Sequence, residues 1–547
     1  MSTAAPDPRM RWWGWGIDRD AMELPASAQA MIEGGLGVKE APPARVELDQ
    51  IQLPASRLGP WLRAQLEAIV GAEAVRDDQL ARVSHAAGRS YSDLIRLRSG
   101  QIEAPDAVVY PGSHDEVRAL LQACSDAGVA VVPFGGGTSV VGGVEPEQGA
   151  FGSVISLDLA RMADLLALDE VSLLATVGPG ITGPELEATL DRYGLTLGHL
   201  PQSWEYVTIG GSVATRSAGQ ASTGYGRIDK LALGLRLAAP TGEVEVKVQP
   251  GTAGPTPAQR ELIVGSEGTL GVITEVTLAV RHTPEVRQYE GWSFKSFAAG
   301  VDAFRELEQA HAAGDVSRLS DETETMMSLA SAGQSGGIAT RLGQRYLKLR
   351  GHVGGCLAIL GFEGESDEAL DRANRARMLL RSAGGLRLGS RPGAAWQHQR
   401  FRAPYLRDEL LDRGVLVETL ETATTWSNLH NLYGAVQNAL RGALGEPCLV
   451  LCHVSHLYPA GASLYYTFMA AQQRGREIEQ WRAAKTAACD AIIAAGGTIT
   501  HHHAIGTDHA GWVPAEIGDL GVDVLRAAKA RLDPRGIMNP GKLLPPA

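Results

Sequence analysis

Short blocks of alternating hydrophobic and polar character begin near residue 84 and predict strands and helices in turn. The apolar run 107–110 predicts a buried strand. Residues 113–128 have helical periodicity, with Ser113 placed to cap the first turn and Gly128 placed to end the helix. The apolar run 129–133 predicts the next strand. This order of strand, helix and strand is typical of an α/β unit.

The same patterns extend over the rest of the chain. We expect helices within residues 43–76, 182–194 and 522–532. Apolar runs predict strands at 154–159, 173–177, 262–264, 272–280, 357–362, 449–453 and 464–468. Because the composition changes after Pro284, we predict an α+β protein in four parts. These are an N-terminal helical segment (1–80), a first domain (81–283), a second α+β domain (284–499) and a C-terminal segment (500–547).

The composition narrows the classes of function. Fifty Lys and Arg against 62 Asp and Glu give a net charge of -12, which disfavours nonspecific nucleic-acid binding. Of the five cysteines, only Cys448 and Cys452 have local spacing, so we expect reduced thiols and no zinc site. Residues 1–7 lack the pattern of a signal peptide, and no stretch has the length of a bilayer span. We therefore expect a cytoplasmic protein.

A glycine-rich loop directly follows the predicted strand 129–133. In the stretch Phe134-Gly135-Gly136-Gly137-Thr138-Ser139, three successive glycines leave the backbone unshielded, so its N–H groups can point into one concavity. Such a nest suits a pyrophosphate, although a tight turn is the alternative for this loop alone. The spacing differs from Gly-x-Gly-x-x-Gly, which argues against a standard nicotinamide-binding fold.

Three further segments accompany this loop in a fixed order. They are residues 201–211 (PQSWEYVTIGG), 214–219 (ATRSAG) and 265–274 (GSEGTLGVIT). Together with the first loop they resemble the vanillyl-alcohol-oxidase-type FAD-binding domain over about residues 84–281. The resemblance implies an FAD cofactor, an FAD-binding domain of two subdomains and an α+β substrate or cap domain after it.

The resemblance also implies which residues contact FAD. The first loop would hold the pyrophosphate, the next two segments the flavin and its ribityl chain, and the last segment the adenine side. The implied cofactor-binding residues are Pro133, Phe134, Gly135, Gly136, Gly137, Thr138, Ser139, Gln202, Ser203, Thr208, Thr215, Arg216, Ser217, Ala218, Glu267, Gly268, Thr269 and Ile273. Some members of this fold link FAD to a His or Cys of the first loop. Because this chain has Thr138 there and no His nearby, we expect non-covalent FAD.

The FAD-binding domain alone leaves the reaction open. Dehydrogenases of D-lactate and 2-hydroxyglutarate bind a metal through His-x-Gly-Asp-Gly-Asn-x-His and a later Glu-His pair. The matching stretch 453–461 (HVSHLYPAG) lacks the Gly-Asp-Gly-Asn core, and a His replaces the later Glu within residues 501–503. We therefore expect no metal. An FAD-linked oxidase or dehydrogenase of a 2-hydroxy acid or alcohol stays as the alternative function, with a non-catalytic FAD-binding protein behind it.

A second resemblance, to the alkyldihydroxyacetonephosphate synthases, covers most of the chain. Residues 12–16 (WWGWG), 405–408 (YLRD), 460–465 (AGASLY) and 501–506 (HHHAIG) resemble motifs of that family. The resemblance implies a transferase of ether lipid synthesis that exchanges the acyl chain of acyl-dihydroxyacetone phosphate for a fatty alcohol, without net redox chemistry at FAD. The implied catalytic residues are Tyr465, His501, His502 and His503, and Arg407 is the implied ligand of the substrate phosphate.

The residue types suit these roles. An arginine offers a bidentate fork to a phosphate, a tyrosine can move a proton on the carbon beside a ketone, and histidines can help a carboxylate to leave. Simpler explanations stay open. Arg407 could form a surface ion pair, Tyr465 could be a core residue, and residues 501–503 could form an exposed loop.

The chain departs from the family pattern at two places. The arginine that usually precedes the Gly-Ser-Glu-Gly-Thr-Leu motif is missing from residues 249–257, where the nearest basic residues are Lys247 and Arg260. Residues 507–510 (TDHA) replace a basic run. Both departures concern the substrate and the reaction, not FAD. For partners, we expect a small-molecule lipid substrate, a homodimer, peripheral contact with a membrane and no nucleic acid.

Overall fold

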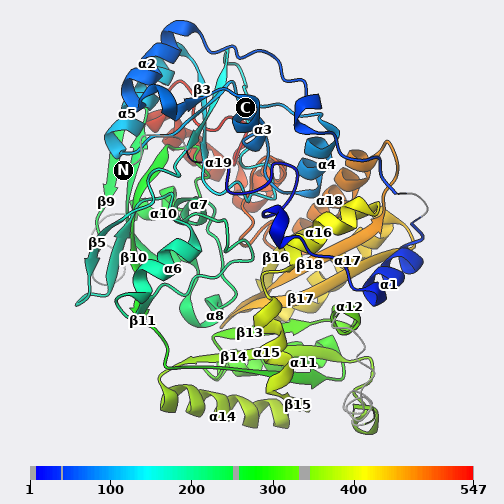
Figure 1. Ribbon diagram of the computed structural model, residues 1–547. Coiled ribbons are helices and arrows are strands. Elements are labelled where there is room, and N and C mark those ends of the chain that lie inside the picture. Colours follow the sequence, from blue (N-terminus) through cyan, green and yellow to red (C-terminus); the bar gives the residue numbers. More distant parts are fainter. Residues whose placement is uncertain are drawn as a thin grey trace.

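The computed structural model describes residues 6, 8–38, 41–249, 258–331, 345 and 347–545. Its strands form four sheets with the orders β1-β2-β4-β3, β5-β6-β10-β8-β9, β11-β7 and β15-β12-β14-β13-β17-β18-β16. Figure 1 shows the first three sheets grouped on one side of the molecule and the seven-stranded sheet on the other. The expected α+β architecture is confirmed. We call the first three sheets and their helices the FAD-binding part, after the sequence prediction, and the seven-stranded sheet with its helices the cap.

The first sheet is mixed and carries the glycine-rich loop. Its strands are β1 (Val75–Arg76), β2 (Ala107–Val109), β4 (Val154–Asp158) and β3 (Ala130–Phe134), and only β1 runs antiparallel to its neighbour. Helix α5 (His114–Ala127) joins β2 to β3 as predicted. The Ser113 hydroxyl accepts a hydrogen bond from the Glu116 N–H (3.2 Å), and Gly128 ends the helix with a φ of 66°. These local signals place the loop at the end of a buried parallel strand.

The second sheet is antiparallel and completes the FAD-binding part. Its strands are β5 (Leu165–Asp169), β6 (Leu174–Val177), β10 (Val272–Ala279), β8 (Ala232–Ala239) and β9 (Gly242–Val246). Strands β7 (Leu195–Thr196) and β11 (Arg281–His282) pair with each other in a separate two-stranded sheet, and β11 directly follows β10 in the chain. The helices of this part are α3 (Gln79–Ser84), α6 (Gly183–Asp191), α7 (Ile209–Ala214), α8 (Ser222–Tyr225), α9 (Ile228–Leu231) and α10 (Gln259–Ile263). Helix α4 (Tyr91–Ser99) instead packs against the seven-stranded sheet and its helices.

The third large sheet forms the cap domain and is antiparallel throughout. Its strands are β12 (Val286–Phe294), β13 (Val316–Ser320), β14 (Cys356–Gly364), β15 (Leu386–Gly389), β16 (Val415–Thr425), β17 (Cys448–Tyr458) and β18 (Gly461–Ala471). One face packs into the main apolar core under α11 (Phe297–Gln309), α14 (Ser366–Ser382), α17 (Leu429–Leu444) and α18 (Glu477–Ala494). The opposite face is turned toward the FAD-binding part.

Strand β18 shows how the sequence separates these two faces. Leu464, Tyr466 and Phe468 belong to the main core, whereas the intervening Tyr465, Thr467 and Met469 line a cavity between the domains. Successive side chains of a strand point to opposite faces, so this period of two decides which residues reach the cavity.

The N-terminal segment and the C-terminus are divided between the two parts. Helix α2 (Pro60–Val70) packs with α5 in the core of the first sheet, whereas α1 (Ala26–Leu36) lies beside α12 (Glu322–Ser331) in the cap (Figure 1). Helix α19 (Val513–Leu532), which is kinked at Gly518, leads the chain back to the first sheet, where Met538 pairs with Val131. Segments far apart in sequence therefore build each domain.

Two predicted elements are wrong. Of residues 43–76, only 60–70 form an α-helix, because Pro43, Pro54 and Gly59 interrupt the preceding stretch and Pro60 begins the helix. Residues 262–264, predicted as a strand, belong to the end of α10 and its cap. A three-residue apolar run does not distinguish a buried strand from one face of a short helix.

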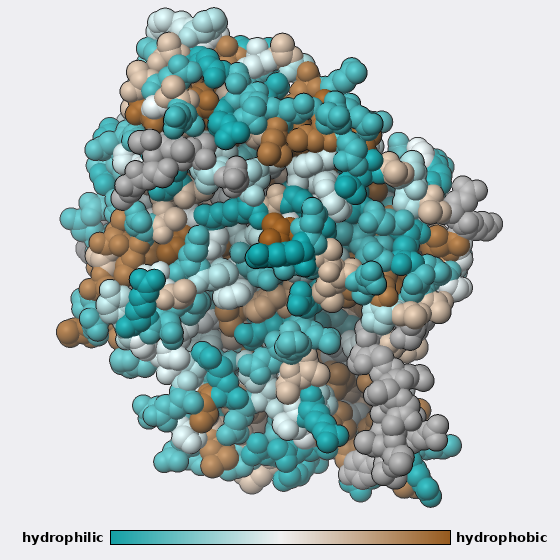
Figure 2. Space-filling view, in the orientation of Figure 1, coloured by the Kyte–Doolittle hydropathy of each residue, from teal (hydrophilic) through white to brown (hydrophobic). Residues whose placement is uncertain are grey.

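The surface is mostly polar on the face shown in Figure 2, where hydrophobic residues form small, separated patches. In the described part of the chain, no helix combines the length and the apolarity that a membrane span requires.

Candidate active site

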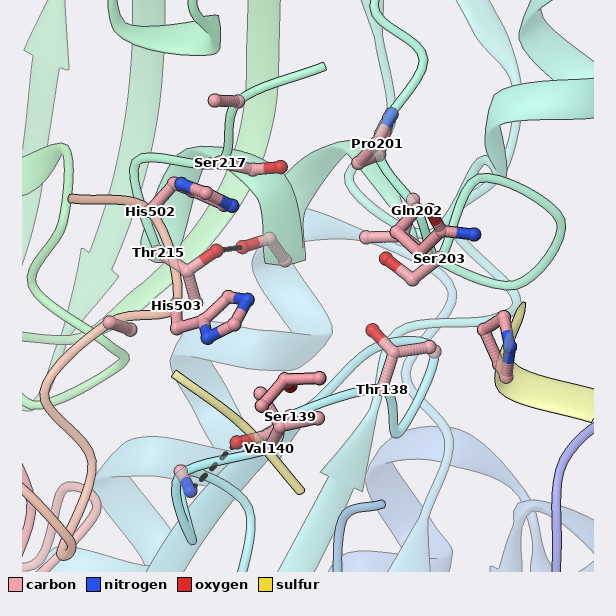
Figure 3. Close-up of a pocket in the computed structure, with 18 of the residues that line it drawn as sticks. Thr138, Ser139, Val140, Pro201, Gln202, Ser203, Thr215, Ser217, His502 and His503 are labelled. Carbon is pink, nitrogen blue, oxygen red and sulfur yellow. Dashed lines mark hydrogen bonds between the residues drawn. The ribbon is translucent and has the colours of Figure 1, made fainter. Parts of the chain in front are cut away.

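A large cavity lies between the FAD-binding part and the inner face of the cap sheet. Loops 133–140, 201–203 and 214–220 line it from the FAD side, and strands β16, β17 and β18 line it from the cap side. Figure 3 shows the side chains of Thr138, Ser203, Ser217 and His503 around one opening, although they come from four separate segments. The fold thus gathers the motifs that the sequence keeps apart.

The glycine-rich loop passes very close to the second FAD-motif segment. A Cβ atom on Gly136 would lie 2.0 Å from the Tyr206 carbonyl oxygen, and one on Gly135 would lie 2.3 Å from the Thr208 hydroxyl. Gly137 has a φ of 66°. The glycines are therefore required first by the contact between the two loops and by the backbone path, rather than only by the space that a ligand needs.

The backbone of this loop fits the pyrophosphate of FAD. Residues 136–139 line the cavity, and within the described chain their N–H groups donate to no acceptor. Four successive free donors beside a cavity make a site for an anion, because buried N–H groups otherwise need partners. When bound here, FAD would supply the electron-accepting and nucleophilic flavin ring that protein side chains lack.

Most other residues that we predicted to hold FAD also line the cavity. These are Pro133, Phe134, Gln202, Ser203, Thr208, Thr215, Ser217, Ala218, Gly268 and Ile273. Two do not. The Arg216 guanidinium turns to Glu261 (3.1 Å), and the Thr269 hydroxyl donates to the Ser266 carbonyl (2.7 Å). Their predicted contacts with FAD stay predictions.

Glu267 lines the cavity but uses its carboxylate inside the protein. It accepts hydrogen bonds from the N–H groups of Ile505 (2.8 Å) and Gly506 (2.7 Å). Burial raises its pKa to about 7, against the opposing effect of these two bonds. Glu267 therefore anchors the segment that follows the three histidines to the FAD-binding part.

The inner face of the cap sheet changes from titratable to apolar along its strands. One row across β17, β18 and β16 consists of His453, Tyr465 and Glu421. Four residues farther along β18, or about 13 Å at the rise of a strand, Met469 pairs with Val417. The sheet thus presents a reactive end and a hydrophobic end to one cavity.

The hydrophobic end is completed by helices from three parts of the chain. Side chains of α1 and the segment before it, of α12, of α16 (Ala403–Asp412) and of strands β16 and β18 line it together. The residues are Leu24, Ile32, Met327, Leu406, Leu410, Val417 and Met469. This arm of the cavity suits an alkyl chain, because such surface gains from excluding water.

Tyr465 lies at the reactive end of the cavity, where imidazole rings surround it. Its ring stacks on His453 at 4.9 Å and meets the edge of His503 at 5.3 Å. Burial raises the Tyr465 pKa to about 12, although the hydroxyl of Thr419 works in the opposite direction. The phenol therefore keeps its proton at neutral pH and faces the cavity as a donor.

Arg407 projects into the same cavity from α16. Its Nε is buried without a hydrogen-bond partner in the described chain, and no carboxylate there forms an ion pair with it. By contrast, Arg318, which also lines the cavity, is paired with Glu324 at 2.8 Å. Arg407 is therefore the cavity arginine whose charge remains available to an anion.

Asp408, which follows Arg407 in α16, binds the N-terminal aromatic motif to this helix. The buried Asp408 carboxylate accepts hydrogen bonds from the Trp15 N–H (2.7 Å), Arg11 (2.8 Å) and Arg98 (3.2 Å). Gly16 has a φ of 70° and passes against the ring of Tyr405. The motif at residues 12–16 thus fixes the helix that carries Arg407, and Trp15 itself lines the cavity.

The three consecutive histidines form a bend rather than an exposed loop. His502 and His503 line the cavity. His501 does not, because its Nε2 bonds to the Tyr458 hydroxyl at 2.8 Å. The N–H groups of all three histidines donate to the carboxylate of Glu421 at 2.8–3.0 Å.

One group of imidazoles has the spacing of metal ligands. Ring nitrogens of His456, His501 and His502 lie within 4.8 Å of one another. However, both nitrogens of His456 already have partners, since Nε2 donates to the Gly219 carbonyl (3.0 Å) and Nδ1 accepts from the Ser463 hydroxyl (3.1 Å). A metal would have to displace one of these bonds. The expectation of no metal stays a prediction.

Sequence reasoning missed Glu421 and the pair formed by Arg318 and Glu324. A signal for Glu421 exists, because two charged residues, Glu418 and Glu421, interrupt the otherwise uncharged run 415–423. Its partners were not predictable, since they lie about 80 residues away.

The arginine that is missing from the family pattern would lie within residues 249–257, of which 250–257 lie outside the described residues. Of the nearest basic residues, Lys247 is exposed, and Arg260 donates a hydrogen bond to the Ala232 carbonyl (3.2 Å).

Comparisons with known proteins agree with this arrangement. Residues 105–247 match the model of the "FAD binding domain", and residues 283–543 match "FAD linked oxidases, C-terminal domain". FAD as the cofactor is thereby confirmed. The alkyldihydroxyacetonephosphate synthase of Dictyostelium discoideum is 34% identical over 510 residues, which cover 91% of this chain and 83% of that protein.

Two further comparisons give the same family. The alkyldihydroxyacetonephosphate synthase of Trypanosoma brucei brucei is 33% identical over 526 residues, which cover 94% of this chain and 85% of that protein. A solved structure of alkyldihydroxyacetonephosphate synthase superposes with a TM-score of 0.84 at 32% identity, covering 98% of this chain and 99% of that one. Since sequence, fold and cavity agree, the chain belongs to the alkyldihydroxyacetonephosphate synthase family.

Proposed function

We propose that this protein exchanges the acyl chain of acyl-dihydroxyacetone phosphate for a fatty alcohol. The main observation that supports this proposal is that one cavity holds an arginine without an anionic partner, a row of titratable side chains and an apolar arm. A phosphate, a reacting carbon and an alkyl chain need these three environments. The family membership supports the same reaction.

The groups of the chain have separate tasks in this exchange. Arg407 binds the phosphate through charge-assisted hydrogen bonds. Tyr465, whose phenol stays protonated, moves the proton on the carbon next to the ketone. The histidines give a proton to the departing fatty acid and take one from the entering fatty alcohol. The C–O bond to the acyl group breaks and a C–O bond to the alcohol forms, so no electrons are gained or lost overall.

The apolar arm supports a lipid as the substrate. It begins next to the row of Tyr465 and continues to Met469, so a chain attached near the reacting carbon can extend away from water. A homodimer, peripheral contact with a membrane and a cytoplasmic location stay predictions.

The test is a direct exchange assay. Acyl-dihydroxyacetone phosphate and a labelled fatty alcohol are incubated with the purified protein, and labelled alkyl product and free fatty acid are measured. We expect equal amounts of both. A flavin that is bleached by a 2-hydroxy acid in protein without exchange activity would favour the oxidoreductase alternative. So would activity that a chelator abolishes and zinc or manganese restores.

A further inference from the structure

Glu421 occupies a position that none of the predicted catalytic roles explains. It lies on β16 directly opposite Tyr465, and its side chain is 0% exposed. A buried carboxylate without partners would be strongly unfavourable. The groups around Glu421 therefore have to compensate for its burial.

The Glu421 carboxylate accepts hydrogen bonds from four residues of the described chain, Thr500 to His503. Oε1 accepts from the N–H groups of His501 (3.0 Å), His502 (3.0 Å) and His503 (2.9 Å), and from the hydroxyl of Thr500. Oε2 accepts from the His501 N–H at 2.8 Å. A protonated carboxyl group would lose the hydrogen bond to the oxygen that carries its proton and could donate only to Nδ1 of a neutral His502 or to the Thr500 hydroxyl among the described residues. The converging N–H groups therefore favour the ionised form.

Three successive N–H groups that converge on one oxygen form a nest around an anion. Without that anion, the N–H groups of residues 501–503 would lose the acceptor that they share and would be left unpaired. The bend of the histidine loop and the charge of Glu421 thus depend on each other.

Only one of the three imidazoles touches the carboxylate. His502 Nδ1 lies 3.3 Å from Oε2 of Glu421, and His502 is the sole ion-pair partner of Glu421 among the described residues. Nδ1 of His501 lies 3.0 Å from the same Nδ1 of His502. His502 Nε2 has no partner in the described chain and is left for the cavity.

The imidazole rings on either side of His502 are held in the neutral form. Burial, together with the charge of His502, lowers the pKa values of His501 and His503 to about 3. Burial raises the pKa of Glu421, but His502 and its neighbours outweigh this effect and hold it well below its ordinary value. The titratable groups that face His502 are Glu421 on β16, His453 and His456 on β17, Tyr465 on β18, His501 and His503 in the loop, and His199 of the FAD-binding part.

We propose that Glu421 is a positioning residue that shapes the histidine loop and selects His502, through Nδ1, as the proton carrier of the exchange. Its carboxylate favours the imidazolium and directs Nε2 into the cavity. A carboxylate that orients and stabilises an imidazolium without taking its proton is an established arrangement in acyl transfer.

This inference rests on the proposed exchange reaction, in which the protons balance. The Nε2 proton of His502 passes to the carboxylate oxygen of the departing fatty acid as its bond to carbon breaks. Neutral His502 then takes the hydroxyl proton of the fatty alcohol as the new C–O bond forms. One proton has moved from the alcohol to the acid, and His502 is imidazolium again.

Kinetic profiles of three variants test the role. In Glu421→Gln we expect kcat to fall on the order of 10²- to 10⁴-fold with little change in KM for the phosphate substrate. Without the negative charge, the alkaline fall of kcat should move to lower pH by about one unit or more. Glu421→Asp keeps the charge and should restore the alkaline limb in part. Glu363→Gln, which alters another buried glutamate of the cap sheet, should leave the pH profile unchanged.

A second measurement is independent of the reaction. Protein labelled with ¹⁵N at histidine is titrated by NMR, and the His502 signals are identified from a His502→Gln spectrum. We expect His502 to lose its proton at lower pH in Glu421→Gln than in the wild type. An unchanged titration in a folded variant that retains FAD would overturn the proposal. If the wild-type protein shows no exchange activity while the His502 titration still shifts in Glu421→Gln, the proposed reaction is overturned, and only the control of the His502 charge by Glu421 stands.

Discussion

Tyr465 and Glu421 are direct partners across strands β18 and β16, and both side chains emerge on the face of the cap sheet that borders the cavity. The first keeps a proton at neutral pH, and the second has the character of a buried anion. Because antiparallel pairing holds the two positions about 5 Å apart at Cβ, the histidine loop that Glu421 fixes is held next to the phenol.

Removing the hydroxyl of Tyr465 should separate binding from chemistry. In Tyr465→Phe the ring can still stack on His453, so we expect KM to change little. The proton transfer is lost, so kcat should fall on the order of 10²- to 10⁴-fold. Steady-state exchange kinetics with saturating substrate measure this. Near-normal turnover would rule out the tyrosine as the proton carrier.

Removing Arg407 should mainly weaken binding. Its guanidinium contacts the phosphate in ground and transition states alike, so Arg407→Ala should raise KM about ten- to a hundredfold, the equivalent of about 1.5–3 kcal/mol. The exposed Arg391 of α15 (Ser390–Gln399) provides a charge-matched control. If Arg391→Ala raises KM equally, the effect comes from the overall charge and not from this contact.

Breaking the attachment of the N-terminal motif should disturb Arg407 indirectly. Asp408→Asn removes the charge that pairs with Arg11 and Arg98 in a buried site. Such a loss costs about 3–5 kcal/mol, so the Tm should fall and KM for the phosphate substrate should rise. Asp412→Asn is the control, since the Asp412 side chain is 57% exposed. Differential scanning fluorimetry and kinetics on both variants decide the prediction; equal effects would contradict it.

FAD should be held without a covalent bond. We expect the purified protein to be yellow and to release intact FAD on acid precipitation, because Thr138 cannot form the known linkages. Gly136→Val should lose FAD, since its Cβ would lie 2.0 Å from the Tyr206 carbonyl oxygen and force the loop out of place. Gly152→Ala meets no atom within 4 Å and should bind FAD normally. Flavin that remains in the protein pellet would refute the first expectation, and normal FAD content in Gly136→Val the second.

The anchor formed by Glu267 should make stability depend on pH. Burial raises the Glu267 pKa from an ordinary 4.5 to about 7. Between these values the folded protein binds more protons than the unfolded chain, so the free energy of unfolding falls as pH rises through this window. Glu267→Gln cannot ionise and should lack this contribution. Thermal unfolding of both proteins at several pH values from about 4.5 to 7 measures it, and parallel curves would contradict the prediction.

Local signals account for what could be predicted of the fold. Helix α5 lies where Ser113 and Gly128 placed its ends, because capping and the left-handed turn act within a few residues. The short run at residues 262–264 was misassigned, because its periodicity is too brief to distinguish a helix from a strand. The alternation in β18 determined that Tyr465 and Met469 share a face.

The sequence by itself determined the FAD-binding motifs, the α+β architecture with a second sheet domain after them, and the residue types available to the site. Only the tertiary structure decided that Glu421 meets the loop that contains His502 and that Asp408 holds the N-terminal motif. The sequence separations, about 80 and 390 residues, are spanned by strand pairing and by the packing of the two domains. Such contacts depend on the total burial of both domains, which no local pattern encodes, and so the partners of a buried charge become known only when the chain is folded.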